Sequence, residues 1–162
     1  MALLLHTGAE QIEYDELRDL PIPAATSTHV PIPHHRVVDM LVHTLSFYGH
    51  EVIEQHHGVT KDGLRYFGLL SLRSPYTGYT DTVGLRNSHD KTFPIGIAFG
   101  AKVFVCDNLS FIADHVIRRK HTANAMRAIG VKRALHCLIE TCSRCLIWFP
   151  RQPSLVLFPT RY

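Results

Sequence analysis

The chain has 162 residues, which is enough for one hydrophobic core and too short for two. Hydrophobic residues make up 46% and charged residues 19%, an ordinary balance for a folded globular protein, so the composition argues against disorder. The opening Met-Ala-Leu-Leu-Leu-His has no basic region, and no stretch approaches the roughly 20 apolar residues of a membrane span. We therefore expect a cytoplasmic protein with no membrane partner and with reduced cysteines.

Charge is divided unevenly along the chain. The formal net charge is −6 before Lys61 and +9 from Lys61 onward, which gives +3 overall. Such an excess of basic residues favours an anionic partner for the C-terminal part, and nucleic acid is the usual one. The alternative is that the two halves neutralise each other in the fold.

The first clear element is a helix. Residues 1–29 are expected to form an N-terminal arm with about one helical turn around 14–20, because prolines and small residues dominate the remainder. Pro33 suits the first turn of a helix, and apolar residues then recur at helical spacing as far as Tyr48. Gly49 stands where a left-handed residue commonly ends a helix.

Four strands are predicted after this helix. Residues 51–60 and 64–73 form a hairpin, whose turn contains a glycine suited to a positive φ. The second of these strands is apolar on both faces and is expected to be central. Residues 79–88 and 95–106 follow as the third and fourth strands. Two glycines inside the last strand indicate a bulge or close packing, at Gly96 and Gly100.

A second helical pattern begins at Leu109, with apolar residues toward one side and basic residues on the rest. The predicted order is helix, hairpin, two strands, helix. It describes a single α+β domain over residues 30–134, with an antiparallel sheet of about four strands and helices on one face. Residues 135–162 form an atypical tail that is rich in cysteine, proline and aromatic residues.

The densest polar cluster is Asn87-Ser88-His89-Asp90. Such side chains suit a turn, because they hydrogen-bond nearby backbone groups. His89, supported by Asp90, could instead act as a base or help to hold a metal or phosphate. The turn is the preferred reading, and whether the protein is an enzyme stays open, with a binding protein favoured.

Metal and cofactor sites are not predicted. Adjacent histidines on a strand point to opposite sides, and His56 and His57 are expected to be exposed near the hairpin turn. Cys142 and Cys145 form one C-x₂-C, and no second pair follows at zinc-binding spacing. No glycine-rich phosphate loop occurs.

Basic residues of the predicted sheet and last helix are the candidates for nucleic-acid contacts. The preferred set is Arg86, Lys102, Arg118, Arg119 and Lys120. Three tyrosines could stack on unpaired bases, namely Tyr66, Tyr76 and Tyr79. The alternatives are core or sheet-edge packing for the tyrosines and a solvated basic face for the helix.

Four motifs resemble one known family: Val30-Pro31-Ile32-Pro33, the run Gly84 to Thr92, the run Val103 to Asn108, and Lys120-His121-Thr122. They are similar to domain-of-unknown-function family 932, whose members are often labelled phage/plasmid-like proteins. The family-motif residues here are Asn87, Ser88, His89, Asp90, Cys106 and Asn108. The resemblance implies a mobile-element setting, which favours DNA metabolism or host–element conflict. The predicted order of elements is also similar in topology to phage single-strand-annealing recombinases.

The tail departs from the family pattern of long charged helices, so we expect a truncated or frame-altered member. The leading hypothesis is a DNA-binding protein that acts in recombination or host conflict, with single-stranded DNA as the candidate ligand. One alternative is a metal- or phosphate-dependent enzyme that uses His89 and Asp90. Another is a structural module that forms a homo-oligomer through strand edges or the apolar tail.

Overall fold

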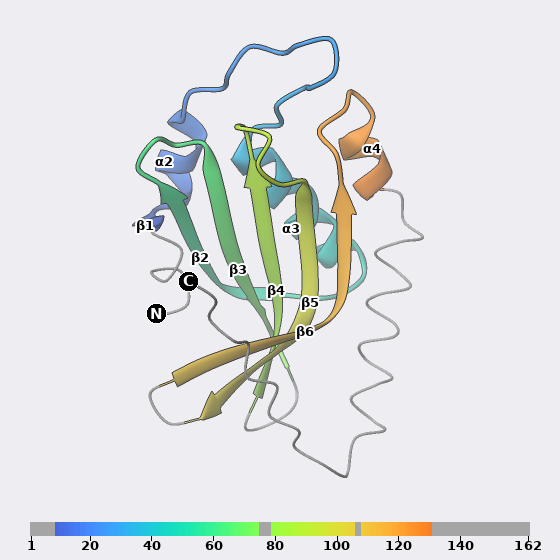
Figure 1. Cartoon of the computed structure of the whole chain (residues 1–162). Helices are drawn as coiled ribbons and strands as arrows, with labels where there is room; N and C mark the ends of the chain where they lie inside the picture. Colours follow the sequence, from blue (N-terminus) through green and yellow to red (C-terminus); the bar gives the residue numbers. More distant parts are fainter. Residues whose placement is uncertain (1–8, 75–78, 106–107, 131–162) are drawn as a thin grey trace.

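The computed structural model describes residues 9–74, 79–105 and 108–130, and they form one sheet with three helices (Figure 1). In chain order the elements are β1 Ala9–Ile12, α2 Tyr14–Asp19, α3 His34–Phe47, β2 Val52–Thr60, β3 Arg65–Leu72, β4 Tyr79–Ser88, β5 Ile95–Val105, β6 Asn108–Arg119 and α4 Ala125–Gly130. The predicted α+β class is confirmed. Within these residues, no helix is long and apolar enough to cross a membrane.

The sheet has six antiparallel strands in the order β1-β2-β3-β4-β5-β6, so every strand lies beside its neighbours in the sequence. The four predicted strands correspond to β2–β5, and β3 lies inside the sheet as expected. The predicted count of about four strands was wrong, because β1 and β6 also belong to the sheet. The expected arm thus contributes β1 to the sheet, and it contributes Leu17 of α2, only 1% exposed, to the core.

The helix predicted from Leu109 is the main error, since that segment forms strand β6 up to Arg119. Its apolar residues Ile112 and Val116 are four apart. A spacing of four places two side chains on one face of a helix, so the pattern indicated a helix. In β6 the strand register shifts opposite Phe99 and Gly100, between these two residues, so the spacing has no such meaning there. The β-branched residues of this segment favour the strand. Only the end of the predicted helix is helical, as α4.

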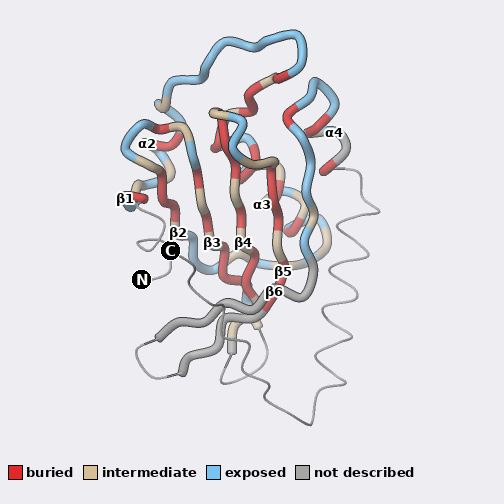
Figure 2. Tube along the Cα trace, in the orientation of Figure 1, coloured by how far each residue is buried: buried red, intermediate tan, exposed pale blue. Residues whose placement is uncertain are grey.

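Helix α3 lies behind the sheet in the view of Figure 1 and supplies one side of the core. Val37, Leu41 and Leu45 are fully buried on its sheet-facing side. Gly49 follows the helix with φ +81°, and Gly63 in the hairpin turn has φ +70°, so both predicted positive-φ glycines are confirmed. Figure 2 shows buried segments along β2–β5 and α3, whereas the final residues of β6 are mostly exposed.

Strand alternation gives the sheet two chemically different faces. Along β4, Val83, Leu85 and Asn87 are buried on the face toward the helices. Gly84 and Arg86 therefore lie on the opposite face, which we call the outer face. Within the described part of the chain, no helix packs on the outer face (Figure 1).

Candidate nucleic-acid interface

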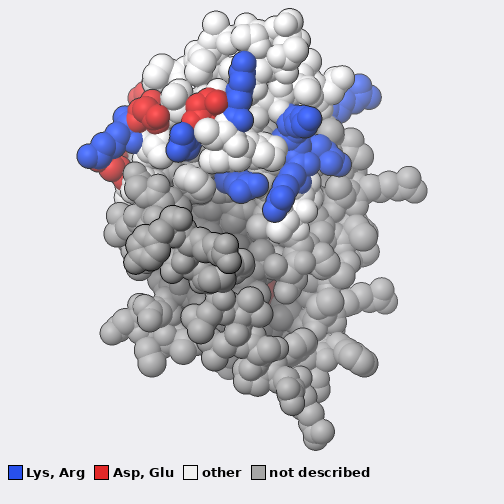
Figure 3. Space-filling view, viewed as in Figure 1, with Lys and Arg blue, Asp and Glu red and all other residues white. Residues whose placement is uncertain are grey.

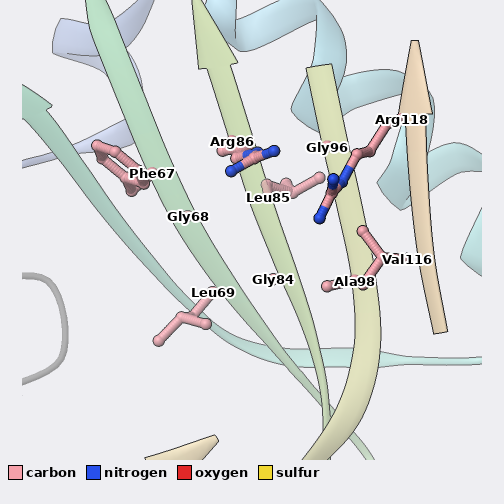
Figure 4. Close-up of a pocket in the computed structure, with 10 residues that line it drawn as sticks. All are labelled: Phe67, Gly68, Leu69, Gly84, Leu85, Arg86, Gly96, Ala98, Val116 and Arg118. Atoms are coloured by element: carbon pink, nitrogen blue, oxygen red, sulfur yellow. The ribbon is translucent and has the colours of Figure 1, made fainter. Parts of the chain in front are cut away.

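The outer face carries a groove that is built from two rows of residues in register across β3–β6. The first row is Phe67, Arg86, Gly96 and Arg118, and the second is Leu69, Gly84, Ala98 and Val116. Large side chains stand on β3 and β6, at the two ends of the rows. Small residues occupy much of the middle. The result is a cavity of about 300 Å³ on the sheet surface (Figure 4).

Arg86 lies across the floor of this groove because Gly96 has no side chain. A Cβ atom at Gly96 would stand 2.8 Å from Nε and 2.9 Å from Cγ of Arg86, which is closer than real Cβ contacts. The guanidinium of Arg86 lies 5.2 Å from the ring centroid of Phe93, in cation–π range. The ring centroid of Phe93 in turn lies 5.6 Å from that of Phe67. Glycine and two aromatic rings thus hold the cation at one end of the groove, and the predicted close packing at Gly96 is confirmed.

Two arginines face one another here without a carboxylate partner among the described residues. Burial, followed by the charge of Arg118, lowers the pKa of Arg86 below its ordinary value. Arg65 and Arg73 differ, because Arg65 binds Asp90 at 2.6 Å and Arg73 binds Glu51 at 2.6 Å. Two neighbouring guanidinium groups that lack such partners form a site that favours an anion.

The other predicted cations have different surroundings. Arg119 and Lys120 are exposed at the end of β6 and just after it, where Arg119 donates to the carbonyl of Arg118 at 3.1 Å. The prediction had placed both on a helix, which was wrong, because Arg119 is the last residue of strand β6 and Lys120 follows it. Lys102 pairs with Thr80 through the backbone of β5, and its side chain lies outside the described residues. Figure 3 shows Lys and Arg side chains gathered on the right of this face, with Asp and Glu side chains toward the left.

The structure describes the side chain of only one of the three tyrosines that were considered as stacking residues. Tyr66 is fully buried in the core, which agrees with the alternative of core packing and not with a stacking surface. The side chains of Tyr76 and Tyr79 lie outside the described residues. The aromatic residue on the outer face is Phe67, the neighbour of Tyr66 in β3. Because that strand is apolar on both parities, hydropathy could not tell which of the two rings faces the core.

Asp90 belongs to a hydrogen-bonded turn. Its Oδ1 accepts from the hydroxyl of Ser88, and from the backbone N (3.0 Å) and Oγ1 (2.5 Å) of Thr92. Its Oδ2 accepts from Nε of Arg65 at 2.6 Å. Burial disfavours the ionised carboxyl, yet these bonds outweigh burial and hold the pKa of Asp90 well below its usual range. Four bonds occupy the acceptor sites of one carboxylate, so little capacity is left to orient His89.

His89 points away from this turn into a buried network, whose centre is Asn87. Asn87 donates one amide hydrogen to the Ile32 carbonyl at 2.8 Å and the other to Nδ1 of His34 at 2.9 Å. It accepts at Oδ1 from Nε2 of His121 at 2.7 Å. His89 donates from Nε2 to the same Ile32 carbonyl at 2.8 Å. These four residues and Ile32 form what we call the Asn87 network.

The geometry of the Asn87 network fixes a neutral ring at His34, and burial disfavours the charged form of the other histidines. Since Asn87 donates to Nδ1 of His34, the proton of that ring lies on Nε2, which donates to the Gly63 carbonyl at 3.1 Å. Burial, and then the adjacent His89 ring stacked at 4.0 Å, lowers the pKa of His34 to about 3. Burial, and then the rings of His29 and His89, lowers the pKa of His121 to about 4.

The network gives the family motifs a structural role that the sequence alone did not reveal. Ile32, Asn87, His89 and His121 come from three separate motifs and meet in one buried cluster. Nδ1 of His89 is also buried and makes no hydrogen bond among the described residues, so solvent does not reach it. Of the remaining motif residues, Asn108 begins β6 and Cys106 lies outside the described residues.

Among the described residues, no group of three or more His, Cys, Asp or Glu side chains has an arrangement that could hold a metal ion. His57 was expected to be exposed, but it is only 4% exposed, so that prediction was wrong. Its Nδ1 bonds the hydroxyl of Tyr66 at 2.9 Å, within the core. Cys137, Cys142 and Cys145 lie outside the described residues.

The chain is similar to one protein family. The model of the family described as Domain of unknown function (DUF932) matches residues 24–146, which is more than half of the chain. The match extends beyond both ends of the motif region, which runs from Val30 to Thr122. No curated protein and no solved structure matches the chain.

Proposed function

Because the chain belongs to the DUF932 family, whose description names no activity, we propose its function from the groove: it binds DNA, in single-stranded form, on the outer face of the sheet. The observation that carries this proposal is the pair Arg86 and Arg118, which face each other beside Gly96 without a described carboxylate partner. A phosphate group satisfies two such guanidinium groups at once. The mobile-element role, in recombination or host conflict, is part of the same proposal.

The exposed Arg119 and Lys120 extend this site along the end of β6. Four cations in sequence and space can neutralise successive phosphates of one strand. Each neutralised phosphate of a single strand contributes about 0.7 to the slope of log affinity against log salt. Raising salt from about 50 to about 200 mM should therefore weaken binding about 50-fold if all four cations contact phosphates.

The test is a fluorescence-anisotropy titration of the full chain with a labelled thymidine oligonucleotide at these two salt concentrations. Arg86→Gln and Arg118→Gln keep a polar side chain and remove the charge, so each should weaken binding and reduce the salt slope by about 0.7. Lys61→Gln is the matched control, because Lys61 is an exposed cation in the β2–β3 turn near Glu10 (3.6 Å). If the chain binds neither single strands nor duplex DNA at the lower salt, the proposal is rejected.

A further inference from the structure

The groove differs from a simple basic patch because its middle is apolar and nearly free of side chains. Gly84 and Ala98 supply the open floor, so peptide backbone and one methyl group are accessible there, whereas the Arg86 side chain covers Gly96. Phe67 and Leu69 border this floor on β3, and Val116, 51% exposed, borders it on β6 (Figure 4). A flat apolar surface between apolar walls suits a flat ring.

The polar groups of the groove stand at one end of it. Arg86 and Arg118 belong to the first row, whereas the second row (Leu69, Gly84, Ala98 and Val116) is wholly apolar. The rows are two residues apart along each strand, about 7 Å. A nucleotide has the same division, with a flat base at one end and an anionic phosphate at the other.

The volume of about 300 Å³ lies at the lower limit for small-molecule pockets, so the groove accommodates one nucleotide at a time. A base within a duplex is stacked and paired, and it would have to leave the helix to enter. A base of a single strand is already available.

Resting on the proposed function, we infer that the groove takes one unpaired nucleotide. Its base lies on the floor formed by Gly84 and Ala98, and its phosphate lies between Arg86 and Arg118. Among the described residues that line the groove, these two arginines carry the only polar side chains. Base edges therefore meet few hydrogen-bonding groups, and the site accepts different bases with little preference.

The first test uses the wild-type chain and three labelled DNA probes of equal length: a thymidine single strand, an abasic single strand and a duplex. The abasic strand has the same phosphates and lacks the bases. Stacking of one base is worth at least about fivefold in affinity. The thymidine strand should therefore bind at least about fivefold more tightly than the abasic strand, and more tightly than the duplex.

The second test fills the groove by Ala98→Leu, which leaves both arginines in place. This variant should bind the thymidine strand about as weakly as the wild type binds the abasic strand. Ala24→Leu is the matched control, since it adds the same side chain at an exposed position outside the sheet. Far-ultraviolet circular dichroism checks that each variant folds, and the three-probe comparison needs no variant at all.

The outcomes separate this inference from the proposed function. Equal, salt-dependent affinity for all three probes would overturn the nucleotide pocket and leave DNA binding in place. Unchanged affinity of a folded Ala98→Leu for the thymidine strand would also overturn the pocket. Binding of none of the probes at low salt would reject both proposals.

Discussion

Gly68 on β3 and Gly96 on β5 show that the lack of a side chain has a different role on each face of the sheet. A Cβ atom at Gly68 would stand 2.1 Å from the hydroxyl oxygen of Tyr66, on the core side. Tyr66 is fully buried and also bonds His57, so its ring has little freedom to move. At Gly96 the obstructed side chain is Arg86, which is only partly buried and can move aside.

Substitution by alanine should therefore affect stability at Gly68 and DNA binding at Gly96. Gly68→Ala should lower the free energy of unfolding by about 2 kcal/mol or more, because it overpacks the core. Gly96→Ala should change stability by less than about 1 kcal/mol but weaken DNA binding, because it displaces Arg86 from the groove floor. Urea unfolding and the anisotropy titration measure the two effects. Similar stability losses for both variants would contradict the assignment of the two faces.

Asn87 is the residue on which the buried network depends. Asn87→Ala leaves Nδ1 of His34 and Nε2 of His121 without their hydrogen-bond partners in a buried site. Each buried unsatisfied group costs about 1–3 kcal/mol, so for two groups we expect a loss of about 2–6 kcal/mol. The midpoint of urea unfolding measures it. Gln11→Ala removes an exposed amide from β1 and serves as the control. A midpoint for Asn87→Ala equal to that of Gln11→Ala would refute this role.

At the scale of elements, the sequence predicted the helices and strands whose ends are marked by a proline or a glycine. Helix α3 has Pro33 before it and Gly49 after it, and the β2–β3 hairpin has Gly63 in its turn, so both were placed to within about two residues. Strand β6 has no such signal, and the spacing of its apolar residues resembles that of a helix because a register shift interrupts the strand alternation. The short β1 is recognisable only through its pairing with the distant β2.

The candidate site was predicted in part for a related reason. Charge alone selected Arg86 and Arg118, and the structure brings these two together through strand register. Charge alone could not separate them from Arg65, because its partner Asp90 lies 25 residues away in the sequence. The groove itself depends on which parity of β4 and β5 faces outward. Alternation indicates that parity, since Ile95 and Ile97 alternate with Gly96 and Ala98, but the strand register that aligns the rows cannot be read from the sequence.

At the scale of the whole molecule, β4 connects the two features. Asn87 points into the buried network, while its neighbour Arg86 points into the groove. The network also holds the segment before α3 and the turn after β6, because the backbone N of Val30 bonds the carbonyl of His121 at 3.1 Å. The family motifs thus fix the end of the sheet that presents Arg86 and Arg118.

This arrangement makes stability dependent on pH with a definite sign. Unfolding returns His34 and His121 to an ordinary pKa of about 6.5, whereas in the fold the values are about 3 and about 4. The unfolded chain therefore binds more protons below pH 6.5, and the folded state loses stability as pH falls. Burial lowers the pKa of His50, His57 and His89 in the same direction. Burial raises the pKa of Asp81, so this one carboxyl favours the folded state as pH falls and opposes the effect of the histidines.

The free energy of unfolding should be constant above about pH 7 and then fall between about pH 6 and 4. Each neutral buried histidine contributes up to about 1.4 kcal/mol per pH unit to this fall. His121→Gln keeps a donor for Asn87 and removes one titrating group, so it should reduce the slope by about that amount. His43→Gln removes an exposed imidazole from α3 and should behave as the wild type does. Urea unfolding at pH 7 and pH 5 decides the matter, since equal stability at both values would show that the buried histidines do not control it.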